Sequence, residues 1–263
     1  MQLTFSDPFQ FFDLIYCINL DSRPDRWQEA VRAFSAIGIL DRVERVAAII
    51  YADPHEGCRL SHLECVRRAE AAGAENVLIF EDDVVFRGFS YQRLAQSLKR
   101  LSTIPDWELF YLGGYVLATP ESYGDLMRVP MAMTHAYAIH RRAFGKIQES
   151  TSPYDIWLAM NMKSYCAHPL LALQRDGFSD LEKVWIYREG QEMRAYMDFV
   201  ANPKAKTFVG EFLRRRIRWR LFRRRVKLRV KGFAGRLTSA LGLRGSILGQ
   251  TQEQGFPPEK GAQ

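Results

Sequence analysis

The sequence predicts an α/β fold with a mostly parallel central sheet. Short apolar segments alternate with segments of helical periodicity, at the spacing of strand–helix units. The chain of 263 residues is 47% hydrophobic and 13% aromatic, which is enough to build a substantial core. Its length suits one large domain or two small ones, and we find no internal repeat.

The first half of the chain is expected to hold three strands, each followed by a helix. The strands are predicted at residues 14–19, 43–50 and 77–80. The helices are predicted at residues 26–37, 57–73 and 91–101, because apolar side chains recur there with the helical period. Asp21 and Ser22 offer an N-cap to the first helix, whereas Gly38 and Gly73 end the first and second helices.

The second half continues the alternation. Its predicted elements are strands at residues 108–112, 134–140 and 170–174, a helix from Arg142 and a short helix at 155–162. In sheets of this kind, ligands bind beyond the carboxyl ends of the strands. Three groups of residues are therefore expected to converge on one crevice: Asn19 with Asp21, the carboxylates at 81–83, and Gly113 with Gly114.

Three adjacent carboxylates, Glu81, Asp82 and Asp83, follow the third predicted strand in the segment LIFEDDVVF. Adjacent carboxylates repel one another, and they cannot be desolvated together without compensation. A solvated turn is one interpretation, but the apolar residues on both sides favour a compensating cation. Mg²⁺ or Mn²⁺ suits closely placed carboxylate oxygens and commonly shares its coordination shell with substrate phosphates. The segment therefore predicts a site for a metal ion and a nucleotide diphosphate.

Three sequence blocks, taken in order, resemble glycosyltransferase family 25, which contains lipopolysaccharide-biosynthesis galactosyltransferases and collagen galactosyltransferase domains. The blocks are YCINLDSRPDRW, GCRLSHLECVRRA and LIFEDDVVF, and the last resembles that family's version of the DxD motif. Weaker similarities are ELFYLGG, THAYAIHRRA, SPYDIWLA and FSDLE. The resemblance covers residues 13–182.

The resemblance implies a GT-A-type, Rossmann-like domain that uses a nucleotide sugar, usually a UDP-sugar, and inverts the anomeric carbon. It implies seven nucleotide-sugar-binding residues in the three blocks: Asn19, Arg23, Arg26, Ser61, His62, Glu81 and Asp82. Mn²⁺ or Mg²⁺ is the expected cofactor. Asp83 is the first choice of metal ligand, and Asp82 and His168 are the further ligands.

Inverting transfer needs a base that removes the acceptor hydroxyl proton while the leaving diphosphate is neutralised. Asp155, in SPYDIWL, is the candidate base; a helix N-cap is its alternative role, and the two are compatible. Other candidates also have structural alternatives: a surface ion pair for Arg26, a hydrogen-bonded core position for His62, and a turn before a strand for His168. Asp180, in FSDLE, falls in a family-like block without an assigned role.

The net charge of +7 conceals a division of the chain. Residues 1–203 hold 21 basic and 27 acidic residues, a net charge of −6, whereas residues 204–263 hold 16 and 3, a net charge of +13. We therefore predict a glycosyltransferase domain at 1–203, a basic amphipathic helical tail at 204–249 and a disordered end at 250–263.

The tail has 12 Lys and Arg residues between Arg214 and Arg236, and Trp219, Phe222 and Val226 begin an apolar stripe at helical spacing. Such a helix suits the surface of an anionic membrane, where a lipid-linked saccharide acceptor would lie. A nucleic-acid-binding arm and a solvated charge run are the alternatives.

The expected location is the cytoplasm, on the inner face of a bacterial cytoplasmic membrane. The N-terminus lacks the basic region of a signal peptide, no run of about 18 apolar residues predicts a spanning helix, and the four cysteines show neither metal nor disulfide spacing. The leading hypothesis is transfer of a hexose to a lipopolysaccharide or other surface-glycan acceptor. The alternatives are a metal-dependent nucleotidyltransferase or phosphohydrolase, and a non-enzymatic membrane-surface adaptor on a degenerate transferase fold.

Overall fold

The structure is a computed structural model, and it describes residues 7–117, 121–122, 124–181, 184–187 and 189–190. The predicted tail at 204–249, the end at 250–263 and the domain boundary at 203 lie outside these residues. Within the described ranges, no helix is both long enough and apolar enough to cross a membrane.

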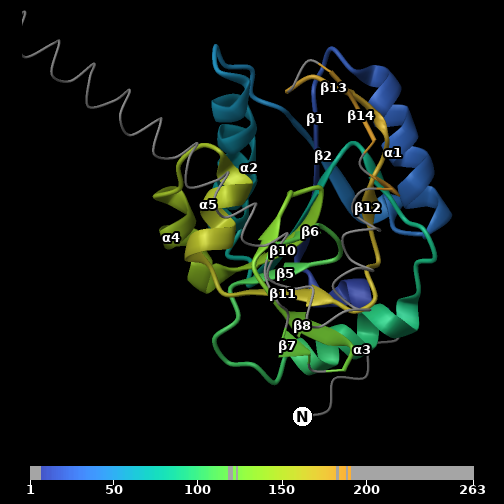
Figure 1. The fold of residues 1–263 in the computed structure, drawn as a ribbon, viewed down its shortest axis with the longest axis vertical. Coiled ribbons are helices and arrows are strands. Elements are labelled where there is room, and N and C mark those ends of the chain that lie inside the picture. The colour runs from blue at the N-terminus through green and yellow to red at the C-terminus, as the bar shows by residue number, and fades with distance from the viewer. Residues whose placement is uncertain (1–6, 118–120, 123, 182–183, 188, 191–263) are drawn as a thin grey trace, which may run out of the picture. The chain divides into compact units, whose positions relative to one another are not determined.

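A mixed sheet of eight strands forms the centre of the described chain (Figure 1). In spatial order its strands are β2 (Val43–Ala47), β1 (Leu14–Asn19), β3 (Asn76–Glu81), β10 (Ala136–His140), β5 (Leu109–Tyr111), β11 (Ser164–Ala167), β8 (Leu126–Arg128) and β7 (Glu121–Ser122). Six of these strands run in one direction, and β10 and β8 run against them. The predicted α/β class with a mostly parallel sheet is confirmed.

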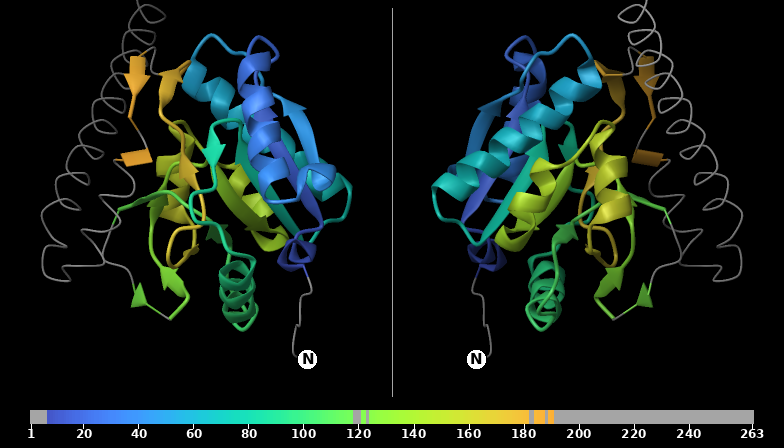
Figure 2. Two further views of the ribbon diagram at one scale, coloured as in Figure 1. Left: turned by 90° about the vertical axis from the view of Figure 1, so that its right-hand side faces the viewer. Right: turned by 90° about the vertical axis from the view of Figure 1, so that its left-hand side faces the viewer.

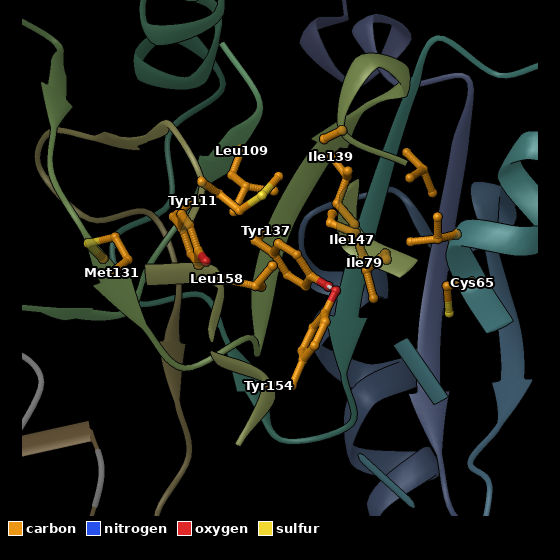
Figure 3. Close-up of a cluster of buried hydrophobic side chains, with 14 of the residues drawn as sticks. Cys65, Ile79, Leu109, Tyr111, Met131, Tyr137, Ile139, Ile147, Tyr154 and Leu158 are labelled. Atoms are coloured by element: carbon orange, nitrogen blue, oxygen red, sulfur yellow. Dashed lines mark hydrogen bonds between the residues drawn. The ribbon is translucent and has the colours of Figure 1, made fainter. Parts of the chain in front are cut away.

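Helices cover both faces of this sheet (Figures 1 and 2). One face carries α1 (Pro24–Ala36) and α3 (Tyr91–Leu101), and the other carries α2 (Pro54–Ala71), α4 (Phe144–Gln148) and α5 (Tyr154–Asn161). Side chains alternate between the faces along a strand. In β3, Leu78 and Phe80 pack with α1 and α3, whereas Ile79 packs on the other side with Tyr137 and Leu158 (Figure 3).

Three two-stranded ladders and three 3-10 helices complete the elements of the described ranges. The ladders are β4 (Val84–Val85) with β12 (Leu173–Gln174), β6 (Tyr115–Val116) with β9 (Met131–Ala132), and β13 (Gly177–Ser179) with β14 (Val184–Ile186). The 3-10 helices are Pro8–Phe11, Leu40–Arg42 and Arg141–Ala143. β4 directly follows the adjacent carboxylates, so its ladder brings β12 beside them.

The predicted N-cap of the first helix is wrong. α1 begins at Pro24, and its N-cap is Arg23, which makes no side-chain capping bond. Proline at the first helical position has its φ already set for a helix and needs no hydrogen-bond acceptor, so a capping side chain is not required to start the helix. The Asp21 carboxylate instead pairs with Arg45 at 2.5 Å.

The predicted last strand at residues 170–174 is wrong for most of its length. The sheet takes β11 instead, and only Leu173 and Gln174 form a strand, against β4. Leu171 and Ala172 both donate their N–H groups to the Leu112 carbonyl after β5, so this stretch packs against the end of a sheet strand without joining the sheet as a strand itself.

The four cysteines, which show no disulfide spacing in the sequence, form no disulfide bonds. Cys17, Cys65 and Cys166 are buried, Cys58 is partly buried, and all four are free. Burial raises the pKa of each of these thiols, and Cys17, Cys65 and Cys166 behave as small apolar core residues.

Candidate functional site

A pocket of about 740 Å³ lies at the carboxyl ends of β1, β2 and β3. α1, which links β1 to β2, and α2, which links β2 to β3, cover opposite faces of the sheet. The ends of β1 and β3 therefore flank the point at which the connections change face, where α/β sheets bind ligands. The pocket is lined by residues 18–20, 22–23, 25–26, 29, 48–51, 54, 57–58, 61–62, 81–83, 174–181 and 185.

Two of the three predicted groups of strand-end residues contribute to this pocket, although Asp21 of the first group is not in its lining. Asn19 and the adjacent carboxylates line it, whereas Gly113 and Gly114, after β5, do not. β10 runs antiparallel between β3 and β5, so it separates the end of β5 from the pocket. Residues 49–51, which follow β2, line the pocket instead of the two glycines.

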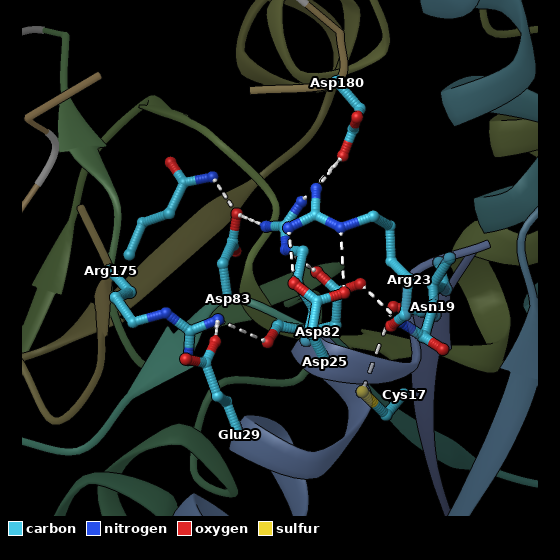
Figure 4. A network of polar contacts seen from close by, with 12 residues as sticks. Cys17, Asn19, Arg23, Asp25, Glu29, Asp82, Asp83, Arg175 and Asp180 are labelled. Carbon is cyan, nitrogen blue, oxygen red and sulfur yellow. Dashed lines mark hydrogen bonds and ion pairs between the residues drawn. The ribbon is translucent and has the colours of Figure 1, made fainter. Parts of the chain in front are cut away.

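Asn19 ties the carboxyl end of β1 to that of β3. Its Nδ2 donates to Asp82 Oδ2 at 2.7 Å and to the Arg23 carbonyl at 3.1 Å. Its Oδ1 accepts from Arg45 Nε at 2.9 Å. The side chain is buried, and its amide is satisfied on both its donor and acceptor sides, which fixes Asp82 in place (Figure 4).

Arg26 supplies a cation that compensates the adjacent carboxylates. Its Nε lies 2.9 Å from Asp82 Oδ1, and its Nη2 lies 2.5 Å from Asp83 Oδ2. The side chain is only 14% exposed, so the alternative of a surface ion pair is wrong. Burial raises the pKa of the Asp82 carboxyl to about 6, although the Arg26 guanidinium opposes this shift.

Glu81 contacts α2 and the segment before β10, not Arg26. Its Oε1 accepts from Thr134 Oγ1 at 2.7 Å and lies 3.5 Å from His62 Nε2. Burial raises the pKa of Glu81, but these two contacts outweigh it and leave the pKa below its usual value. His62 is buried, bonds the Tyr137 hydroxyl at 3.1 Å and stacks on Tyr154 at 4.9 Å between ring centroids. It has the contacts of a hydrogen-bonded core histidine and also lines the pocket.

Asp83 is held by a segment that lies 91 residues later in the chain. Gln174 Nε2 donates to Asp83 Oδ2 at 2.9 Å, and the Arg175 N–H donates to the Asp83 carbonyl at 2.7 Å. The β4–β12 ladder sets both contacts, because it places Gln174 opposite Val84. The Arg175 guanidinium contacts Glu29 of α1 at 2.6 Å (Figure 4).

Asp180, in the turn after β13, completes the charged lining. It pairs with Arg23 and lies 3.6 Å from Arg26 Nη1 (Figure 4). Arg23 also pairs with Asp25 at 2.8 Å. Asp180, to which the sequence assigned no role, therefore belongs to the pocket together with the predicted Arg23.

The GCRLSH block shapes the pocket through backbone packing. Ser61 Oγ donates to the Gly57 carbonyl and accepts from the Ile49 N–H, both at 2.8 Å. A Cβ at Gly57 would lie 2.7 Å from the Ile49 carbonyl oxygen, so only glycine permits this approach. Ser61 lines the pocket, and its hydroxyl bonds the backbone and fixes residues 49–51 against α2.

Exposed apolar side chains gather at the pocket. Of the eight large hydrophobic residues that are exposed in the described ranges, five line it: Ile49, Ile50, Tyr51, Phe178 and Trp185. We call these five residues the apolar rim. Exposed apolar groups concentrated at a pocket mark a surface that binds a ligand or a partner.

The charged lining has an excess of negative charge. Its carboxylates are Asp25, Glu29, Glu81, Asp82, Asp83, Asp176 and Asp180, and its guanidinium groups are Arg23, Arg26 and Arg175. With all ten groups ionised, seven negative charges face three positive ones. A diphosphate would be repelled by this pocket unless a further cation entered with it.

Asp83 offers the position for such a cation. Its Oδ1 is buried and has no hydrogen-bond partner, while its Oδ2 contacts Arg26 and Gln174. In the part of the chain that the structure describes, no group of three or more His, Cys, Asp or Glu side chains is arranged to hold a metal ion. The residues fit Mg²⁺ or Mn²⁺ held by one or two carboxylates together with water and phosphate oxygens, and not a cage of protein ligands alone.

Asp155 lies outside the pocket lining. Its Oδ2 accepts from the Met133 N–H at 3.1 Å, and its Oδ1 accepts from the Ile156 N–H at 2.8 Å. The N-cap of α5 is Pro153, so the alternative of an N-cap is wrong by two positions. Met133 has a left-handed φ of 71°, and the next residue, Thr134, bonds Glu81. The contacts of Asp155 therefore support the turn that positions Thr134.

His168 is not brought to the acidic residues. It lies in the turn between β11 and β12, outside the pocket lining, and its N–H donates to the Asp125 carbonyl at 3.0 Å. β10 and β5 separate β11 from β3 in the sheet. His168 therefore lies in a turn before a strand, which was its alternative interpretation. It does not lie beside Asp83 as a metal ligand.

No family model matches the chain. Part of the sequence is similar to curated proteins named "Glycosyltransferase 25 family member". The protein from Aedes aegypti is 30% identical over 38% of this chain and 21% of its own length. The protein from Drosophila pseudoobscura pseudoobscura is 28% identical over 38% of this chain and 20% of its own length. The chain thus spans about a fifth of the length of these relatives.

Two solved structures resemble parts of the chain, with TM-scores below 0.5. The crystal structure of A197 from STIV has a TM-score of 0.40 and 11% identity, over 66% of this chain and 92% of that one. A glycosyltransferase involved in the glycosylation of the major capsid of PBCV-1 has a TM-score of 0.38 and 13% identity, over 56% and 73%.

Proposed function

The chain is related to glycosyltransferase family 25, as its three sequence blocks predict, and we propose that it is an inverting enzyme that moves a hexose from a nucleotide sugar to a saccharide acceptor. One observation supports this most. Asn19, Arg26, Asp82 and Asp83 form one bonded group in a pocket at the β1–β3 switch point.

The donor in this proposal is a UDP-sugar. The pocket volume of about 740 Å³ falls within the range of small-molecule sites. The diphosphate would lie at Asp82 and Asp83, with Mn²⁺ or Mg²⁺ at Asp83 Oδ1. When bound, such an ion neutralises the charge of the leaving diphosphate. Arg23 and Arg26 line the same pocket and offer guanidinium donors to phosphate oxygens.

The apolar rim supplies flat surfaces beside this charged lining. Nucleobases and the carbon faces of pyranose rings pack well on aromatic side chains, because both present broad apolar surface with polar edges. We therefore propose that Tyr51, Phe178 and Trp185 contact the rings of the donor and the acceptor.

The acceptor in the proposal is a lipopolysaccharide or another surface glycan, bound to lipid at the inner face of the bacterial cytoplasmic membrane. The support is the composition of residues 204–249, which are strongly basic with an apolar stripe. Nucleic acid is the less favoured partner for this tail.

A panel of nucleotide sugars with Mn²⁺ tests the proposal. We expect UDP-sugars to raise Tm only when Mn²⁺ is present, and UDP to be released slowly by hydrolysis. Formation of UTP and a sugar 1-phosphate when pyrophosphate is added would favour a nucleotidyltransferase, and release of UMP and a sugar 1-phosphate in place of UDP would favour a phosphohydrolase. Absence of any response to nucleotides would favour the non-enzymatic adaptor.

A further inference from the structure

We propose that Arg26 is a resident counter-ion of Asp82 and Asp83, and that a divalent cation binds these carboxylates well only when a diphosphate draws Arg26 away from them. This inference rests on the proposed function and adds to it the exchange of charges that donor binding requires. Its consequence is a strong coupling between metal binding and diphosphate binding.

The carboxylate oxygens are largely engaged before any ligand binds. Asp82 Oδ1 contacts Arg26 and its Oδ2 accepts from Asn19, while Asp83 Oδ2 contacts both Arg26 and Gln174. Asp83 Oδ1 is the one carboxylate oxygen of this pair without a protein donor. A metal ion entering alone would therefore find a single free carboxylate oxygen, with a guanidinium beside it. Both features weaken its binding.

The guanidinium is well suited to hold this position. Its fork of donors bridges two carboxylates, at 2.9 Å and 2.5 Å, and the three side chains are between 9% and 14% exposed. An ion pair screened so little by water keeps most of its attraction. Arg26 thus competes with an added cation for the same oxygens.

A diphosphate changes this competition because it offers Arg26 another anionic partner. Arg26 Nη1 lies 3.6 Å from the Asp180 carboxylate, which is beyond hydrogen-bond distance. This terminal nitrogen of the guanidinium is therefore weakly bonded within the pocket. If the phosphate oxygens accept from Arg26, carboxylate oxygens of Asp82 and Asp83 become available to the metal ion. The metal ion and the diphosphate then raise each other's affinity by the same factor.

The experiment measures Mn²⁺ binding to the full chain by isothermal titration, with and without UDP. For the unsubstituted protein, we expect Mn²⁺ to bind at least about tenfold more tightly when UDP is present. In Arg26→Met, we expect Mn²⁺ alone to bind more tightly than it binds the unsubstituted protein, and the effect of UDP to shrink. Arg26→Lys keeps the charge but loses the fork, so it should lie between the two.

Arg23→Gln is the matched control. It removes the same charge from the same pocket, but Arg23 contacts Asp25 and Asp180 and not the Asp82–Asp83 pair. We expect the effect on Mn²⁺ alone to be smaller than that of Arg26→Met. An equal effect would mean that overall pocket charge, and not the position of Arg26, controls metal binding, and would overturn the inference.

Two outcomes separate this inference from the proposed function. If the unsubstituted protein binds Mn²⁺ equally well with and without UDP, while UDP-sugars still bind, only the counter-ion role is refuted. If it binds neither Mn²⁺ nor UDP, the proposed function fails. Because this comparison needs no substitution, it remains decisive even if Arg26→Met does not fold.

Discussion

At the scale of single residues, the three adjacent carboxylates have three different environments. Glu81 is braced by Thr134 and approached by His62, and Asp82 is held by Asn19 and Arg26. Asp83 retains a buried oxygen without a hydrogen-bond partner. Glu81 and Asp82 are therefore not interchangeable. Glu81 links the segment before β10 to α2 through its contacts with Thr134 and His62. Asp83 is the carboxylate best placed for a cation.

Asp155 gives a prediction at this scale. Asp155→Asn removes one of the two acceptors that bond the Met133 and Ile156 N–H groups, because the amide nitrogen cannot accept. Loss of a buried hydrogen bond to a charged acceptor costs about 1–3 kcal/mol, so we expect a drop in Tm of several degrees. Differential scanning calorimetry checks this. An unchanged Tm together with a large fall in kcat would contradict the supporting role and favour the base that the sequence predicts.

At the scale of elements, the contact between α2 and the segment after β2 gives a second prediction. Gly57→Ala would push residues 49–51 outward, since the new Cβ would lie 2.7 Å from a backbone oxygen. We expect the Kd of a UDP-sugar to rise by about tenfold. A loss of about 1.4 kcal/mol of binding free energy, caused by the shifted residues, is enough for that factor. Gly145→Ala in α4 is the matched control, because a Cβ there meets nothing within 4 Å. Equal Kd values for the two variants would contradict the role of Gly57.

The hairpin of β13 and β14 gives a third prediction, which concerns the apolar rim. Trp185→Ala removes a large exposed ring that lines the pocket. We expect KM for donor or acceptor to rise by about tenfold, since stacking on an aromatic ring contributes on the order of 1–1.5 kcal/mol, while Tm stays nearly unchanged. Met160→Ala, an exposed apolar residue of α5 outside the pocket lining, is the control. A KM equal to that of the control would remove Trp185 from the site.

Local pattern predicted the elements that depend on local sequence. β1 and α3 have the predicted bounds, because β1 is a short continuous apolar run and α3 repeats its apolar residues at the helical period. Pairings between distant segments were not predictable in this way. Gln174 and Arg175 reach Asp83 through the two-residue strand β12, and Asp180 reaches Arg23 from a turn. Such short segments carry no periodicity, so only the folded chain shows which distant residues they meet.

The order of the strands in the sheet likewise decides which of the predicted site residues meet. The β1 and β3 ends were predicted to meet because parallel strands share an edge, and they do. His168 and the glycines after β5 were misplaced because the antiparallel insertion of β10 moves β5 and β11 away from β3. The compensating cation was expected to be a metal ion. Arg26, in the first turn of α1, already provides one in the folded chain.

At the scale of the whole molecule, the division of charge predicts where the protein binds. Residues 204–263 carry a net charge of +13, and the rest of the chain carries −6. We expect the full chain to float with liposomes that contain anionic lipids, and to be released by salt because the attraction is largely electrostatic. A chain ending at residue 203 should not float. Equal flotation of the two forms would contradict a membrane role for the tail.

The role of Asp83 in a metal-dependent donor site is tested by Mn²⁺-dependent transfer from a UDP-sugar in Asp83→Asn, compared with Asp176→Asn. Both substitutions remove one carboxylate charge from the pocket lining, but only the first alters the Asp82–Asp83 pair that contacts Arg26. We expect Asp83→Asn to stay folded and to lose transfer by a factor of about 100 or more, because charge stabilisation of the leaving group is lost. Asp176→Asn should retain most activity. Transfer by folded Asp83→Asn at the rate of the unsubstituted protein would contradict a metal-binding role for Asp83.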